Sequence, residues 1–199
     1  MLLLLLMIFD PTGGWSRAAA SGRSVVRIFL IHLLPLLLIG CVAEGAGMVH
    51  WGKPVGEFGA LKVYPLADAV RYEACQFGVL LLIVLIGAVA VKNLGNTFHV
   101  RERYLPALTV CVFGLGPFFL LRVLDAFPAI NPWIPYAIGA VLMAMVLYQG
   151  LPHVMRPDPA HAFGYYVSTV TVLLLLTALG RMLVVYRLPQ LALKFGWIS

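Results

Sequence analysis

Three ionisable residues that lie within strongly apolar stretches are the first candidates for chemistry in this sequence. Glu44, Arg122 and Arg181 each stand near one end of such a stretch. An ionised side chain at the centre of a membrane-spanning helix costs roughly 2.5–3.5 kcal/mol, so residues of this kind are usually paired or functional. We predict that Glu44 pairs with Arg181 or Arg122 and so holds the first helix against its neighbours.

Two alternatives remain open for these three residues. Glu44 could belong to a proton or ion relay, since ionisable groups inside membranes often mark such paths. The long cationic side chains could instead extend to the lipid headgroups and leave the carboxylate without them. A charge swap that fails to restore a Glu44→Lys variant would count against pairing.

Other residue types that do chemistry stand without the neighbours they would need. Ser168, Thr169 and His161 share one helix start but lack a carboxylate and an oxyanion hole. His32 stands alone in an apolar stretch, where a hydrogen bond to another helix is expected and haem ligation would require a second histidine. The three cysteines lie singly in apolar runs and are expected to pack as small residues: Cys41, Cys75 and Cys111. We therefore expect no enzyme activity, no catalytic residue, no metal site and no cofactor.

The amino-acid composition of the chain indicates the environment in which these residues lie. The chain has 199 residues, of which 62% are hydrophobic and 11% are charged, with a mean hydropathy of +0.96. Soluble domains average roughly 45–50% apolar and about 25% charged residues. These values exclude a soluble globular protein, a disordered chain and a nucleic-acid-binding arm. The net charge of +6 is spread along the chain, as expected for charges that flank membrane spans.

The apolar stretches predict an all-α membrane protein, a five-transmembrane-helix bundle with a short N-terminal interfacial helix. A spanning helix needs about 20 apolar residues. Residues 1–26 are expected to form the interfacial segment, anchored at the headgroups by Trp15, and residues 188–199 a short tail. The five spans lie within residues 27–187, at about 27–51, 73–96, 104–124, 133–150 and 162–185.

Prolines and glycines predict where these helices bend or end. A helix from Pro65 to Leu94 would exceed the roughly 30 Å apolar slab, so it should project from the membrane or break near Glu73. Pro117 predicts a kink near the middle of the third span. Gly150 suits a left-handed helix cap, and Pro152 argues against continuation beyond it.

The orientation rests on weak charge asymmetry. The five-span topology divides the 14 Lys and Arg residues evenly between the two sides. We favour a cytoplasmic N-terminus because the first helix usually dominates, and Arg17, Arg23 and Arg27 precede or begin it. In a bacterium the location would be the inner (plasma) membrane.

The segment 147–167 reads Leu-Tyr-Gln-Gly-Leu-Pro-His-Val-Met-Arg-Pro-Asp-Pro-Ala-His-Ala-Phe-Gly-Tyr-Tyr-Val. It resembles the end of the fourth helix and the following loop of bacterial members of the YIP family, the Ypt/Rab-interacting membrane proteins. Weaker similarity lies in Asp10-Pro11-x-x-x-Trp15 and in the prolines of the third span and its turn, Pro117 and Pro128. The matching motif positions are Tyr148, Gly150, Leu151, Pro152, Met155, Arg156, Pro159, Ala162, Gly164 and Tyr165.

The resemblance implies a five-helix membrane domain with a cytosolic N-terminus. Eukaryotic members bind prenylated Rab GTPases, but this sequence lacks their polar N-terminal domain and its Asp-Leu-Tyr-Gly-Pro motif, so we do not expect a Rab-type partner. The expected role is a non-enzymatic scaffold, adaptor or accessory subunit of a membrane assembly. Its partners would be the lipid bilayer and other membrane-protein subunits, without nucleic acid. The alternative is a small transporter or channel with an intramembrane Glu/Arg site at Glu44 and Arg181.

Overall fold

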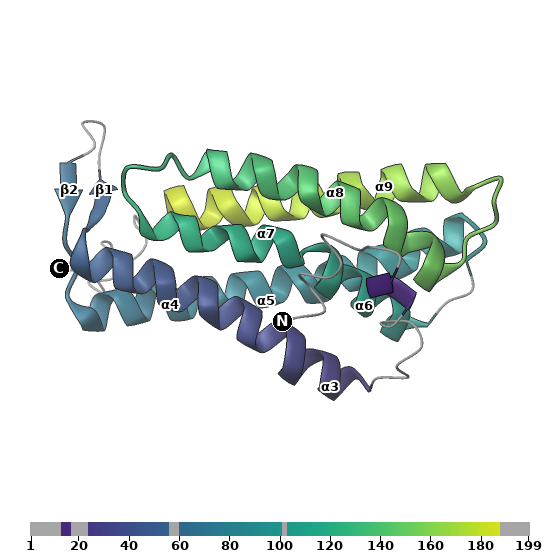
Figure 1. Ribbon diagram of the computed structural model, residues 1–199, viewed down its shortest axis with the longest axis horizontal. Coiled ribbons are helices and arrows are strands. Elements are labelled where there is room, and N and C mark those ends of the chain that lie inside the picture. Colours follow the sequence, from purple (N-terminus) through teal and green to yellow (C-terminus); the bar gives the residue numbers. More distant parts are fainter. Residues whose placement is uncertain (1–12, 17–23, 56–59, 101–102, 188–199) are drawn as a thin grey trace.

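The computed structural model describes residues 13–16, 24–55, 60–100 and 103–187. Within these ranges five helices are long and apolar enough to cross a bilayer. This confirms the all-α membrane bundle that the hydropathy pattern predicts. Figure 1 shows α4 and α5 side by side along one edge of the bundle, with α8 and α9 together along the other.

The spans are built from single helices or from helical pieces in series. The first span joins α3 (Val25–Ile28), the π-helical turn η1 (Phe29–Leu33) and α4 (Leu34–His50). The second is α5 (Leu66–Thr97), and the third joins α6 (Tyr104–Gly114), α7 (Gly116–Leu121) and the 3-10 turn η2 (Arg122–Ala126). The fourth is α8 (Trp133–Met155), and the fifth joins α9 (Ala162–Met182) to η3 (Leu183–Arg187).

A short β-hairpin interrupts the helical pattern between α4 and α5. Strands β1 (Lys53–Val55) and β2 (Ala60–Lys62) pair antiparallel, with Lys53 opposite Lys62. Gly52 has a φ of 79°, and a Cβ there would lie 2.6 Å from the carbonyl oxygen of Lys62. Only glycine fits this turn without strain. The hairpin lies at one end of the bundle, beyond the last turn of α4 (Figure 1).

Helix α5 runs without a break through Glu73, near which its length could require an interruption. It has 32 residues, which at 1.5 Å per residue make about 48 Å, longer than the roughly 30 Å apolar slab. Pro65 precedes its first turn, where a missing N–H costs nothing, and Asp68 lies in that turn near the positive end of the helix dipole. Glu73 is therefore held on a continuous helix.

The third span forms the centre of the bundle. In its most apolar window 78% of the residues are buried, against 28–39% for the other four spans. It divides at Leu115, because Pro117 in the first turn of α7 has no N–H to continue the helix. Gly139 of α8 packs against Phe118, and a Cβ at Gly139 would lie only 3.0 Å from the Cα of Phe118. Glycine thus permits close contact between α7 and α8.

Trp15 is buried inside the protein, so its predicted role as an interfacial anchor is wrong. Its side chain is fully buried, and its indole Nε1 donates a hydrogen bond of 3.2 Å to the carbonyl oxygen of Val146 in α8. The ring also packs edge-on against Phe113, with centroids 6.1 Å apart. A protein carbonyl therefore satisfies the polar end that a headgroup would otherwise satisfy.

The end of α8 also differs from the prediction that Gly150 caps it. The helix continues through Pro152 to Met155, and Arg156 takes the left-handed conformation with a φ of 45°. Gly150 serves packing instead, because a Cβ there would overlap the Trp15 ring, lying 2.7 Å from its Cδ2. Gly150 has no side chain, a property that also suits a helix cap, and here this leaves space for the Trp15 indole.

Candidate functional site

Glu44 lies at the centre of a buried group of polar side chains. Only 3% of it is exposed, and its carboxylate contacts three side chains. It accepts hydrogen bonds from Nη2 of Arg122 at 2.6 Å, from Nε2 of Gln76 at 2.5 Å and from Nζ of Lys53. Two cations and an amide therefore surround one carboxylate, as a buried charge requires.

A second ion pair continues from Arg122 towards the fifth span. Arg181 binds Asp125 through two parallel hydrogen bonds, from Nη1 at 2.6 Å and from Nη2 at 2.9 Å. Its Nη2 also donates to the carbonyl oxygen of Pro132 at 2.8 Å. The Nε of Arg122 lies 3.6 Å from Asp125, so this carboxylate faces both arginines. The paired geometry is the one a guanidinium and a carboxylate form most strongly.

Five segments meet to build this site at the hairpin end of the bundle (Figure 1). Antiparallel helices bring together the end of α4, the start of α5, the turn η2 and the end of α9, while β1 contributes from the hairpin. We name the following seven side chains the polar cluster: Glu44, Lys53, Glu73, Gln76, Arg122, Asp125 and Arg181.

The three residues selected from the sequence all belong to the polar cluster. The structure brings Glu44 and Arg122 into direct contact, and it pairs Arg181 with Asp125 and not with Glu44. Four members were missed as partners: Lys53, Glu73, Gln76 and Asp125. The i, i+3 spacing of Glu73 and Gln76 places them on one helix face, which was the available signal for that pair.

Lys53 links the polar cluster to the water-exposed end of the molecule. It lies outside the spans on β1, and its side chain is 25% exposed. Its Nζ also lies 4.6 Å from the centre of the Tyr72 ring. Burial opposes the charge, but the carboxylate of Glu44 outweighs it, so the pKa of Lys53 is raised above its usual value. Lys53 is accordingly cationic at neutral pH.

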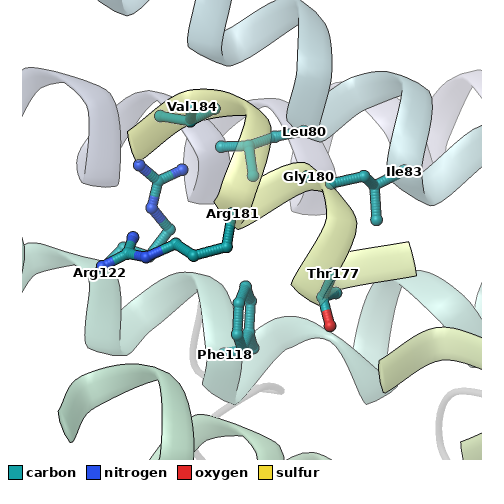
Figure 2. A pocket seen from close by; sticks show the side chains of 8 residues that line it. All are labelled: Leu80, Ile83, Phe118, Arg122, Thr177, Gly180, Arg181 and Val184. Atoms are coloured by element: carbon teal, nitrogen blue, oxygen red, sulfur yellow. The ribbon is translucent and has the colours of Figure 1, made fainter. Parts of the chain in front are cut away.

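A small cavity lies beside the polar cluster, between α5, α7 and α9. Figure 2 shows Arg122 and Arg181 extending to the same side of it, with Phe118 and Ile83 on the apolar walls. Its volume is about 10 Å³, which is close to the least space that holds one water molecule. It has room for a water molecule beside the two guanidinium groups, and not for an organic ligand.

The motif residues between the fourth and fifth helices do not join the polar cluster, because they lie at the opposite end of the bundle (Figure 1). Some of them pack inside: Gly150, Leu151, Met155 and Tyr165 are buried. Ala162 is partly exposed, and the others are exposed: Tyr148, Pro152, Arg156, Pro159 and Gly164. Tyr165 donates its hydroxyl to the carbonyl oxygen of Val91 at 3.0 Å. The buried members therefore connect α8 and α9 to α5 and to Trp15.

Comparison with known proteins adds one result to this geometry. The model of one protein family, described as the Yip1 domain, matches residues 5–180. This match includes the first four spans, the fifth span up to residue 180, and every member of the polar cluster except Arg181. No curated protein and no solved structure matches the chain.

Proposed function

This chain is a member of the Yip1 family, and from that premise we propose that it acts as a non-enzymatic scaffold, adaptor or accessory subunit of a membrane assembly. The main support for this proposal is that the polar cluster holds the spans together. Glu44 with Arg122 and Asp125 with Arg181 each connect two spans by charge-assisted hydrogen bonds. Side chains used in this way stabilise a bundle and leave its lipid-facing surface to make contacts.

The lipid-facing surface offers one place where a partner helix would bind. Tyr148 and Phe163 are 61% and 71% exposed, and Tyr166 packs between them. Tyr166 is fixed by a hydrogen bond of 3.1 Å from its hydroxyl to the carbonyl oxygen of Ala144. We name Tyr148, Phe163 and Tyr166 the aromatic patch. Large, rigid aromatic side chains are enriched where protein surfaces meet.

Site-specific photo-crosslinking tests this proposal in native membranes. A photoreactive phenylalanine replaces Tyr148 or Phe163, and the matched control carries it at Leu82 of α5, which is 55% exposed. We expect discrete protein adducts from the aromatic patch and lipid adducts alone from Leu82. Lipid adducts alone at all three positions would contradict a subunit role for this face.

The second candidate function is a small transporter or channel that uses the Glu44 region. Its support is the burial of Glu44, Arg122 and Arg181 within spans, since such groups often mark ion paths. Ion flux into proteoliposomes, compared between the natural chain and a Glu44→Gln variant, tests it. The transporter is favoured if the natural chain gives more flux than empty liposomes and the variant abolishes that flux. Equal flux through the natural chain and the variant would reject it.

The proposed orientation places the N-terminus in the cytoplasm and the polar cluster on the opposite side of a bacterial plasma membrane. It rests on the arginines just before and at the start of the first span, Arg23 and Arg27. Labelling by a membrane-impermeant thiol reagent tests it after the native cysteines are replaced. Lys62→Cys should react in intact cells and Asp158→Cys only after permeabilisation, while the reverse pattern would invert the topology.

A further inference from the structure

Gln76 holds two buried carboxyl groups close together. Its Nε2 donates to Oε2 of Glu44 at 2.5 Å and to Oε2 of Glu73 at 2.9 Å. Gln76 is fully buried and Glu73 is 8% exposed, so water does not screen the two acids from each other. Like charges in such a setting oppose each other's ionisation.

The cations of the polar cluster are divided unequally between its acids. Glu44 contacts Lys53 and Arg122, and Asp125 contacts Arg181 with Arg122 nearby. Among the ranges that the structure describes, Glu73 forms an ion pair with no lysine or arginine. A buried carboxylate without a partner cation is strongly unfavourable, so Glu73 is the acid of the polar cluster that a further positive charge would stabilise most.

Two buried oxygen atoms, one of this acid and one of Gln76, also lack a hydrogen-bond donor. Oε1 of Glu73 and Oε1 of Gln76 accept no hydrogen bond from any residue that the structure describes. Both belong to side chains more than nine-tenths buried. Buried oxygens of this kind normally contact a hydrogen-bond donor or a cation, so these two unpaired acceptors indicate a ligand.

The groups around Glu73 enclose it on several sides. Glu44 and Cys41 of α4, Lys53 of β1 and Arg122 of η2 lie near enough to act on its charge. On its own helix it is flanked by Gln76 and Tyr72. The backbone of α4 comes so close that a Cβ on Gly45 would lie 3.2 Å from Cγ of Glu73. This close approach favours a ligand as small as a proton or a bare monovalent ion over a hydrated or organic cation.

We propose that Oε1 of Glu73 binds one exchangeable positive charge, a proton or an alkali metal ion, that enters from the hairpin end of the bundle. A proton would arrive from hydronium, form an O–H bond at Oε1 and leave water behind. A metal ion would be held by the carboxylate and by Oε1 of Gln76. Lys53, with a quarter of its side chain in contact with water, marks the nearby entrance.

Infrared spectroscopy of the full chain in lipid nanodiscs distinguishes the two sources of charge. Spectra are recorded over a range of pH in buffers whose cation is N-methylglucamine, Na⁺ or K⁺. A bound proton predicts a protonated-carboxyl band that titrates identically in all three buffers and falls to background in Glu73→Gln. A bound metal ion predicts a shift of the carboxylate bands in Na⁺ or K⁺ alone, also lost in Glu73→Gln.

The controls make a negative result decisive. Glu73→Gln keeps the shape of a neutral acid and should fold, while Asp158→Asn removes an exposed carboxyl at the other end of the bundle and should change neither signal. Thermal unfolding of the unmodified chain with and without alkali ions needs no variant. The proposal is overturned if neither infrared signal occurs, or if the signal persists in Glu73→Gln.

Discussion

Nη2 of Arg122 lies 2.6 Å from Oε2 of Glu44, although 78 positions separate the two residues in the chain. The contact joins the end of the first span to the end of the third, which is the most enclosed helix of the bundle. Both side chains are at least 94% buried. Neither charge has water to replace its partner, so each depends on the other for solvation.

Separating Glu44 from Arg122 should therefore be costly. Glu44→Gln is expected to destabilise the bundle by about 3–5 kcal/mol, because it leaves a buried guanidinium without its carboxylate. Unfolding in mixed micelles of Glu44→Gln, Arg122→Gln and the double variant forms a double-mutant cycle. The double variant should lose clearly less than the two single losses combined, and additive losses would show that the contact is not made. The Asp68–Arg71 pair, in which the arginine side chain is 62% exposed, should show a coupling below about 1 kcal/mol when treated in the same way.

Arg181 should not be replaceable by lysine. Arg181→Lys keeps the charge but loses the paired hydrogen bonds to Asp125 and the third to the Pro132 carbonyl oxygen. We expect a loss of about 1.5–3 kcal/mol in the free energy of unfolding. Arg187→Lys, near the end of the same helix, provides a comparison for the substitution itself. Equal stability of Arg181→Lys and the natural chain would contradict the bidentate geometry.

Gly150→Ala should displace Trp15. The new methyl group would overlap the indole ring, and overpacking of this kind costs about 1–3 kcal/mol. The fluorescence of Trp15 should shift as it leaves its buried site, measured in a variant that lacks the other tryptophans. Gly78→Ala in α5 is the matched control, since no side chain or backbone atom lies within 4 Å of a Cβ there. A normal Trp15 spectrum in Gly150→Ala would refute this packing.

Gly47→Ala tests the contact between the first span and the end of the third. A Cβ at this position would lie 2.7 Å from the Cα of Ala126, and backbone cannot move aside as a side chain can. We expect a loss of about 1–3 kcal/mol or more. Gly40→Ala, where the nearest atom would lie at an ordinary 3.5 Å, should be tolerated. Equal thermal stability of the two variants would show that the helices are further apart.

The bundle itself could be predicted from the sequence because hydropathy is a property of each segment alone. Five apolar stretches of sufficient length imply five spans wherever the helices finally pack. The role of Trp15 could not be predicted in this way. A tryptophan next to an apolar run has the same local pattern at a headgroup as it has against a protein carbonyl. The deciding contact, Gly150, lies far away in the chain.

The polar cluster was predicted only in part for the same reason. Glu44, Arg122 and Arg181 attract notice because they are charged within apolar runs. Lys53 and Asp125 lie in or beside connections, where charge is ordinary, so nothing local marks them as buried partners. Their assignment to Glu44 and Arg181 depends on the crossing of helices, which the sequence pattern does not encode directly.

The bond between Trp15 and α8 constrains the order in which the protein can assemble. The indole emerges early in synthesis, yet its acceptor lies 131 residues later. The third span likewise packs against α8, so its burial is complete only once α8 is in place. The early segments therefore remain incompletely packed, in contact with lipid or a chaperone, until the last helices are inserted and complete the bundle.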